Sequence, residues 1–166
     1  MNGALLDSAF HPPRENTMRL ATLSLGFAAL IAGTASAAGK PEDAIEYRQS
    51  VYNVIGWNFG PMAQMVKGKT PWNASEFALH ADRVAALAPQ LLEGFPKGSD
   101  SGAKTGAKPE IWSNMDDFKA KMDDFVKQSR ALADVAKGGD ETKVKDQFGK
   151  TAQACKSCHE KYRSKD

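Results

Sequence analysis

Residues 144–163 read VKDQFGKTAQACKSCHEKYR, and the side chains of one helical face recur in them at spacings of three and four residues. These side chains are Val144, Phe148, Ala152, Cys155, His159 and Tyr162. Such spacing predicts an amphipathic α-helix, and Asp140 is a suitable N-cap for it. The last helix of the chain is therefore expected to carry both cysteines near its C-terminal end.

Three earlier segments show the same periodicity. The first covers about residues 41–66, and its leading proline suits the first position of a helix. The second begins after Asn73, a good N-cap with Glu76 three residues on. The third is expected to open at Ser113 and to stop at the glycine pair 138–139. The sequence therefore predicts four helices in all.

Two prolines and one long connection complete the pattern. Pro61 is expected to disturb the first helix because it removes a backbone hydrogen bond, and Pro89 is expected to end or kink the second. Residues 93–110, EGFPKGSDSGAKTGAKPE, form the long connection. Since no stretch alternates as a strand would, we predict an all-α fold, an antiparallel up-down four-helix bundle. Its many alanines leave room for a bulky group inside.

Residues 18–37 have the pattern of a secretory signal peptide. Arg19 supplies a minimal positive start, residues 20–32 form an apolar run, and a cleavage site of small residues ends at Ala37. The apolar run is too short to span a bilayer comfortably. We therefore expect export to the periplasm and cleavage near Ala37, with no membrane association afterwards.

The segment before the signal peptide, residues 1–17, is polar and fits poorly there, so translation is expected to start at Met18. Residues 1–37 would then be an extension plus signal peptide, and residues 38–166 the bundle. The formal net charge of +2 comes from basic and acidic residues that are interleaved. No basic stripe forms, so a nucleic-acid partner is not expected.

The sequence Cys155-Lys156-Ser157-Cys158-His159 is C-x-x-C-H, the attachment signature of a c-type haem. Cysteines at i and i+3 lie on one helix face, so both can reach the vinyl groups of one porphyrin as thioethers. The imidazole of His159 follows directly as an iron ligand. The predicted cofactor is one covalent haem c, whose attachment leaves no thiol for a disulfide.

Two other interpretations of the cysteines are weaker. A structural zinc site needs four ligands, usually in two pairs. The chain after Ala37 offers only Cys155, Cys158, His159 and His80. A thioredoxin-like pair lies in a βαβ setting near a helix start, whereas this pair comes late in the last helix of an all-helical chain.

Beyond this motif, the chain resembles the cytochrome c′ family over residues 40–166. The resemblance rests on KPEDAIEYRQS near the start, NFGPMAQMVKG ending the first helix, KPEIWS before the third and CKSCHEKYR at the end. It implies a four-helix bundle, usually paired as a homodimer through its first two helices. It also implies a five-coordinate high-spin haem whose second iron face is open but crowded.

The resemblance implies roles for particular residues as well. Cys155 and Cys158 would be the thioether attachments and His159 the axial iron ligand. Arg48 and Gln49 match positions that contact the haem and its propionates, and a guanidinium pairs well with a carboxylate. The other matches are Tyr52 as the distal residue, Arg163 as the basic residue near the proximal histidine, and Lys104 and Thr105 as residues near a propionate.

The sixth coordination position decides what the haem does. Residues 51–56 hold no methionine, and Met62 lies about 15 Å along the helix from Tyr52. Met122 is expected to pack rather than to bind iron, and His80 to be an ordinary buried or surface histidine rather than a second ligand. Tyr52 could bind ferric iron as a phenolate, which its ordinary pKa of about 10 disfavours. The sequence therefore predicts an open sixth site.

Three classes of function follow from these features. The first is binding of diatomic gases such as NO and CO. The second is one-electron transfer with a small redox partner protein, for which a six-coordinate low-spin haem is the alternative. The third, an enzyme such as a peroxidase, is weakest because no distal histidine with an arginine partner is evident and Tyr52 is a poor base at neutral pH. We expect a haem protein that is not an enzyme.

Overall fold

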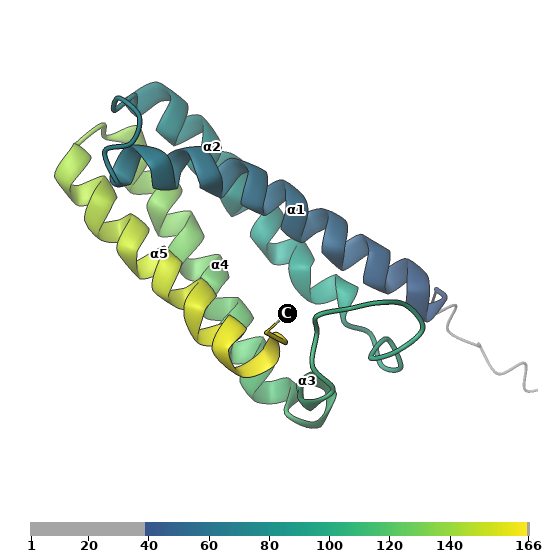
Figure 1. Cartoon of the computed structure of the whole chain (residues 1–166). Coiled ribbons are helices and arrows are strands. Elements are labelled where there is room, and N and C mark those ends of the chain that lie inside the picture. The colour runs from purple at the N-terminus through teal and green to yellow at the C-terminus, as the bar shows by residue number, and fades with distance from the viewer. Residues whose placement is uncertain (1–38, 166) are drawn as a thin grey trace, which may run out of the picture. The chain divides into compact units, whose positions relative to one another are not determined.

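The computed structural model describes residues 39–165, which contain four long helices and two short helical segments. The elements are α1 (Pro41–Val66), α2 (Ala74–Leu87), the 3₁₀ helix η1 (Ala88–Gly94), α3 (Glu110–Ser113), α4 (Met115–Lys137) and α5 (Glu141–Tyr162). Figure 1 shows the four long helices running alternately up and down. The predicted all-α, up-down four-helix bundle is therefore confirmed. The predicted signal peptide, the start at Met18 and the boundary after Ala37 lie outside the described residues.

Side-chain caps begin two of the helices where the sequence predicted them. The Asn73 side-chain oxygen accepts a hydrogen bond from the Glu76 amide at 3.1 Å, at the start of α2. The Asp140 carboxylate accepts from the amides of Thr142 and Lys143, both at 3.1 Å, at the start of α5. These bonds satisfy amides that have no partner within the helix.

The predicted opening of the third helix at Ser113 was wrong. Ser113 instead ends the short helix α3, and its hydroxyl donates to the Glu110 carbonyl at 3.2 Å. Because that hydroxyl is bonded to the turn before it, it does not cap the helix after it. The helical conformation is interrupted at Asn114, and α4 begins at Met115. Buried Ile111 anchors α3 to the bundle.

The two prolines have different effects. Helix α1 continues through Pro61, so the expected disturbance does not interrupt it. The side chains of Met62 and Met65 that follow are only 0% and 4% exposed, and their burial stabilises the last turn against the missing hydrogen bond. The predicted end at Pro89 is confirmed, because α2 stops at Leu87 and the chain continues as η1.

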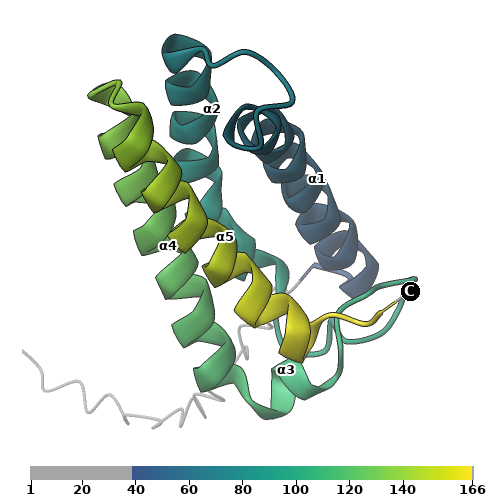
Figure 2. The same cartoon turned by 60° about the vertical axis from the view of Figure 1, so that its left-hand side comes forward.

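The helices pack most closely in the pairs α1–α2, α2–α4 and α4–α5, and Figure 2 shows α4 and α5 side by side. The rings of Phe59 and Phe148 stack with centroids 4.5 Å apart and join α1 to α5. Phe77 lies against Phe148 from α2, at a centroid distance of 6.1 Å. Of these three aromatic residues, Phe59 also lines a cavity of the bundle. None of the helices within residues 39–165 is both long enough and apolar enough to cross a bilayer.

Candidate functional site

A cavity of 640 Å³ lies between α1 on one side and α4 and α5 on the other. Its size is typical of small-molecule and cofactor sites. The connection between η1 and α3 also contributes to its wall, whereas α2 does not. The apolar part of the wall includes Ile55, Phe59, Leu91, Phe95, Ile111, Phe118, Met122, Phe125 and Ala152.

The two cysteines and the histidine of the C-x-x-C-H motif all line this cavity. They do so because Cys155, Cys158 and His159 share one face of α5. The two cysteines form no disulfide with each other. Burial raises the pKa of Cys155 to about 11 and also raises the pKa of Cys158. Neutral thiols are therefore expected at physiological pH, unlike the thiolates of reactive cysteines. Within residues 39–165, no three or more histidine, cysteine, aspartate or glutamate side chains are placed so that they alone could hold a metal ion.

His159 is exposed at the opening of the cavity, and Arg163 lines the same cavity one turn later. Partial burial and, after it, the positive charge of Arg163 lower the pKa of His159. Both effects favour the neutral imidazole, which is the form that binds a metal. The positions of His159 and Arg163 therefore suit a ligand and a neighbouring cation.

The guanidinium of Arg48 lines the cavity although the residue is only 2% exposed. It donates to the Gly94 carbonyl at 3.0 Å, to the Ser99 hydroxyl at 3.1 Å and to the Thr105 hydroxyl at 3.1 Å. None of these acceptors is a carboxylate, and Asp100 acts on Arg48 only at longer range. A buried cation without an ion-pair partner is costly, so an anionic group in the cavity would stabilise it.

Charge in the cavity wall has one sign. Of residues 39–165, four that line the cavity can carry a positive charge, namely Arg48, Lys121, His159 and Arg163, and no aspartate or glutamate of this range lines it. A haem carries two propionate carboxylates, and such anions pair with guanidinium and ammonium groups. Together with the thiols and the imidazole, this wall fits a covalently attached haem.

The remaining residues singled out from the sequence divide into two groups. Gln49, Tyr52 and Thr105 line the cavity. The side chain of Lys104 does not line it, and the backbone carbonyl of Lys104 accepts a hydrogen bond from Gln49 at 2.9 Å. The expectation that Lys104 approaches a propionate therefore has less geometric support than the same expectation for Thr105.

Residues 105–108 form a strap that closes one side of the cavity. Ala107 forms an antiparallel bridge with Arg163. The Ser164 amide donates to the Gly106 carbonyl at 2.8 Å, and the Lys108 amide donates to the Tyr162 carbonyl at 3.0 Å. Since Thr105 also accepts from Arg48, the strap connects α1 to the segment that follows His159. No sequence pattern indicated this connection.

The α1 wall of the cavity faces the motif with Tyr52, Ile55 and Phe59. Burial, the largest cause, and the neighbouring cysteine thiols raise the pKa of Tyr52 well above its usual value, so it is a neutral phenol. Met62 lies in the core and does not line the cavity. His80 does not line it either, because its ring packs between α1 and α2 with Nδ1 3.0 Å from the Asn58 side-chain oxygen.

Two residues of the α4 wall were not expected at the site. Met122 is 5% exposed and lines the cavity, as does the partly buried Lys121. The helical periodicity predicted that Met122 is buried but did not indicate whether it packs in the core or lines a cavity. Lys121 comes one residue before Met122 and therefore lies outside the apolar positions of the helix. The helical periodicity alone cannot distinguish it from a lysine exposed to solvent.

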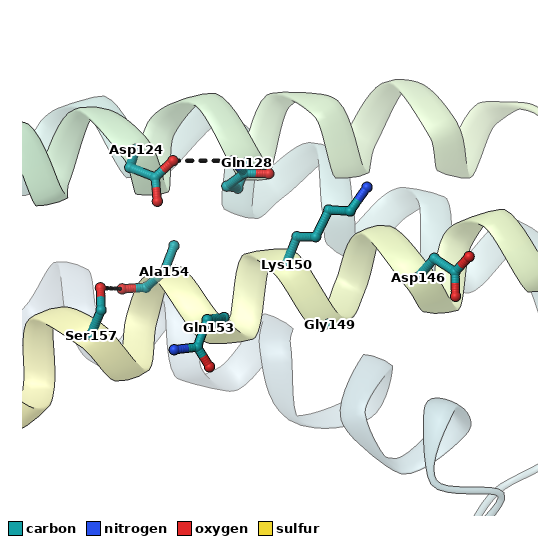
Figure 3. A pocket seen from close by; sticks show the side chains of 8 residues that line it. All are labelled: Asp124, Gln128, Asp146, Gly149, Lys150, Gln153, Ala154 and Ser157. Atoms are coloured by element: carbon teal, nitrogen blue, oxygen red, sulfur yellow. Dashed lines mark hydrogen bonds between the residues drawn. The ribbon is translucent and has the colours of Figure 1, made fainter.

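A second hollow lies between the outer faces of α4 and α5 (Figure 3). Its volume is 570 Å³, and its wall includes Asp124, Asp146 and Lys150. Ser157 borders it from inside the C-x-x-C-H motif, with its hydroxyl donating to the Ala154 carbonyl at 3.0 Å. The cysteines and the histidine do not line this hollow, so the chemistry of the motif belongs to the first cavity.

Proteins similar in sequence to this chain support the assignment of this cavity as a haem site. A sequence model of the cytochrome c′ family matches residues 43–163. The cytochrome c′ of Rubrivivax gelatinosus is 41% identical over 126 residues, which cover 76% of this chain and 98% of that protein. The cytochrome c′ of Allochromatium vinosum is 40% identical over 152 residues, covering 88% of this chain and 97% of that protein.

A solved structure shares the fold as well as the sequence. The cytochrome c′ from Shewanella frigidimarina is 44% identical and superposes with a TM-score of 0.74, covering 76% of this chain and 98% of that one. The family match covers the motif and the four long helices except for the first two residues of α1. The chain therefore belongs to the cytochrome c′ family, whose cofactor is a covalently attached haem c.

Proposed function

We propose that this protein is a periplasmic gas-binding cytochrome c′ with a five-coordinate, high-spin haem. The observation that carries the proposal is the composition of the α1 wall opposite the motif. That wall offers Tyr52, Ile55 and Phe59, and it offers no histidine or methionine. With His159 on one side of the iron, the other side would lack a strong protein ligand.

Several residues of this chain would bind the haem, each at a different part of the cofactor. Cys155 and Cys158 would each form a thioether with the porphyrin, and His159 would bind the iron through its neutral imidazole. Arg48 and Gln49, with Thr105 and Arg163 nearby, would face the carboxylates. The bound haem would supply an iron centre that takes up a diatomic ligand or exchanges one electron.

Nitric oxide is the diatomic ligand that the comparisons favour. A cytochrome c′ variant from Alcaligenes xylosoxidans, 35% identical to this chain with a TM-score of 0.71, has a structure as a nitric oxide complex. In this chain the neutral, largely apolar Tyr52 would screen the open iron face from anions and water. A small uncharged molecule would enter by displacing the Tyr52 ring. We infer a binding protein and not an enzyme.

An absorption spectrum of the purified haem protein tests this proposal. We expect a high-spin ferric spectrum at neutral pH and the formation of CO and NO complexes after reduction. For the alternative, a six-coordinate low-spin electron carrier, Met122 is the thioether side chain in the cavity that could bind the iron. Replacing Met122 by leucine should leave the spectrum unchanged. A low-spin ferric spectrum that turns high-spin in Met122→Leu would establish the alternative.

We further propose a homodimer formed through α1 and α2. The large apolar side chains exposed within residues 39–165 are Val54, Trp57 and Leu79, at 47%, 78% and 50%, and all three lie on these helices. A related cytochrome c′ structure, 37% identical, is described by its ligand-controlled dimer dissociation. Analytical ultracentrifugation should give a dimer, and Trp57→Glu should shift it to the monomer.

Export is the remaining part of the proposal. The signal-like sequence of residues 18–37 and the covalent haem both suit the periplasm. Cleavage near Ala37 would leave residues 38–166 as the mature bundle. Intact mass spectrometry of the protein from the periplasmic fraction, with the haem mass included, checks the cleavage site and the attachment, and the intact mass of the precursor checks the start site.

A further inference from the structure

The cavity meets solvent along the line between α1 and α5. The exposed residues of its wall lie on these two helices, with Gln49, Asn53 and Gly56 on α1, His159 at the end of α5 and Arg163 directly after it. Within residues 39–165, α1 and α5 are not one of the closely packed helix pairs. An opening between these two helices therefore connects the cavity with solvent, and we call it the α1–α5 slit.

The strap closes the α1–α5 slit at one end. The side-chain amide of Gln49, near the start of α1, donates to the Lys104 carbonyl at 2.9 Å. On the other side of the slit, Ala107 forms its antiparallel bridge with Arg163. The chain from Lys104 to Ala107 is thus bonded to both helical edges, and solvent does not reach the cavity freely beside Gln49.

An aromatic contact closes the slit at its other end, where the rings of Phe59 and Phe148 stack with centroids 4.5 Å apart. Because α1 and α5 run in opposite directions (Figure 1), one turn back from Phe59 and one turn forward from Phe148 reach the same level of the bundle. The residues there are Gly56 on α1 and Ala152 on α5, and both line the cavity. The open part of the slit therefore begins at Gly56 and Ala152.

The side chains at this level are too small to fill the slit. Gly56 has none, and a Cβ atom built on it would meet no atom within 4 Å. Ala152 contributes a single methyl group. Tyr52 lies four residues before Gly56 on the same face of α1, and its ring also lines the cavity. A molecule that passes between Gly56 and Ala152 therefore arrives beside the Tyr52 ring.

We propose that the space between Gly56 and Ala152 is the entrance through which a diatomic gas passes from solvent to the iron, and that Gly56 keeps it open. This inference rests on the proposed function, in which the α1 wall faces the open side of the iron. The Tyr52 ring is then a second, inner barrier. An entrance changes the height of a barrier and not the stability of the bound state, so it changes association and dissociation by the same factor.

Flash photolysis of the CO complex of the reduced haem protein tests this entrance. Gly56→Ala adds a methyl group and Gly56→Leu an isobutyl group at the open position. We expect CO association from solvent to slow in that order, by several-fold in Gly56→Leu, and a larger fraction of CO to rebind before it escapes. CO dissociation, measured by displacement with NO, should slow by the same factor, so that the CO affinity stays unchanged.

The inner barrier is separated by repeating these measurements with Tyr52→Ala, in which the ring no longer limits entry. The slowing by Gly56→Leu should be larger in that background. Ala152→Val narrows the same entrance from α5, without a change on the helix that carries Tyr52, and should also slow association and dissociation alike.

The matched control is Gly149→Leu. Gly149 is also an exposed helical glycine with no atom within 4 Å of its Cβ position, and it does not line the cavity. This variant should leave the CO rates unchanged. Haem content and the free energy of unfolding, measured on the same samples, should not fall in Gly56→Ala, because alanine favours a helix more than glycine does.

Each contrary result has a definite meaning. Unchanged CO association in Gly56→Leu, with and without Tyr52→Ala, would overturn the entrance. A changed CO affinity in Gly56→Leu would show that the new side chain acts on the bound ligand, and it would overturn the assignment of Gly56 to the entrance. A reduced protein that binds no CO at all would overturn the proposed function and this inference with it.

Discussion

Arg48 on α1 and Thr105 in the strap are 57 residues apart in sequence, and a hydrogen bond of 3.1 Å joins the guanidinium to the threonine hydroxyl. The same hydroxyl accepts from the Ala107 amide at 3.1 Å. Thr105 therefore organises the turn of the strap while holding a buried cation at the cavity wall. Through the bridge between Ala107 and Arg163, this pair connects the α1 wall to the motif helix.

Replacing Thr105 by valine removes this acceptor and nearly preserves the side-chain shape. We expect the free energy of unfolding to fall by about 1–3 kcal/mol, because one donor of a buried charged group loses its partner. Urea titration of the haem protein measures the change. Thr142→Val is the matched control, since Thr142 is exposed in the first turn of α5. Equal stability of the two variants would show that the bond contributes nothing.

Gly94 allows η1 to end directly against α1. A Cβ atom at this position would lie 2.4 Å from the Cβ and 3.1 Å from the Cα of Arg48. Gly94→Ala should therefore lower the free energy of unfolding by about 1–3 kcal/mol, as overpacking typically does. Gly149→Ala is the control, because nothing lies within 4 Å of its Cβ position within α5. That variant should be stabilised by about 0.5–1 kcal/mol, and a Gly94→Ala protein of unchanged stability would contradict the close packing.

The size of the residue at position 52 should control access of gases to the iron. We expect Tyr52→Ala to speed CO association by about tenfold or more, equivalent to a barrier lower by about 1.4 kcal/mol, because the ring no longer has to move. Tyr52→Phe keeps the ring and should stay within a few-fold of the unaltered protein. Flash photolysis of the CO complex measures both rates. If Tyr52→Phe is as fast as Tyr52→Ala, the hydroxyl rather than the ring limits entry.

Acid should remove the stabilising effect of Asp117. The Tyr162 hydroxyl donates to this carboxylate, and together with the Lys161 ammonium it holds the pKa of Asp117 below its usual value. A carboxylate whose pKa is lowered in the folded state stabilises the protein above the unfolded-state pKa of about 3.9, and the effect is lost as pH falls through the lower folded-state pKa. Asp117→Asn should thus be less stable than the unaltered protein at pH 7.

The pH dependence distinguishes this effect from a general loss of packing. The difference in unfolding free energy between Asp117→Asn and the unaltered protein should shrink as the pH falls below about 4. Asp116→Asn removes the charge of an exposed neighbour and serves as the control. Urea titrations at pH 7 and pH 3 provide the comparison. A deficit of Asp117→Asn that persists unchanged at pH 3 would rule out the carboxylate as its cause.

Local signals predicted most of the helices. Periodicity placed α1 at the residues where the structure has it, and Asn73 and Asp140 cap the helices that follow them. The start of α4 was predicted wrongly because a serine hydroxyl can bond backward as readily as forward, and here it bonds to Glu110. That choice depends on the buried position of Ile111 in α3, which no local pattern encodes.

The sequence by itself determined the bundle, the C-x-x-C-H motif and the cytochrome c′ resemblance, because helical periodicity and a five-residue motif are local properties of the chain. Only the tertiary structure decided that Arg48 is buried without a carboxylate, that Lys121 and Met122 line the cavity and that the strap pairs with residues 162–164. These facts depend on contacts between segments distant in sequence. Helix packing, rather than residue type, sets which side chains face the cavity.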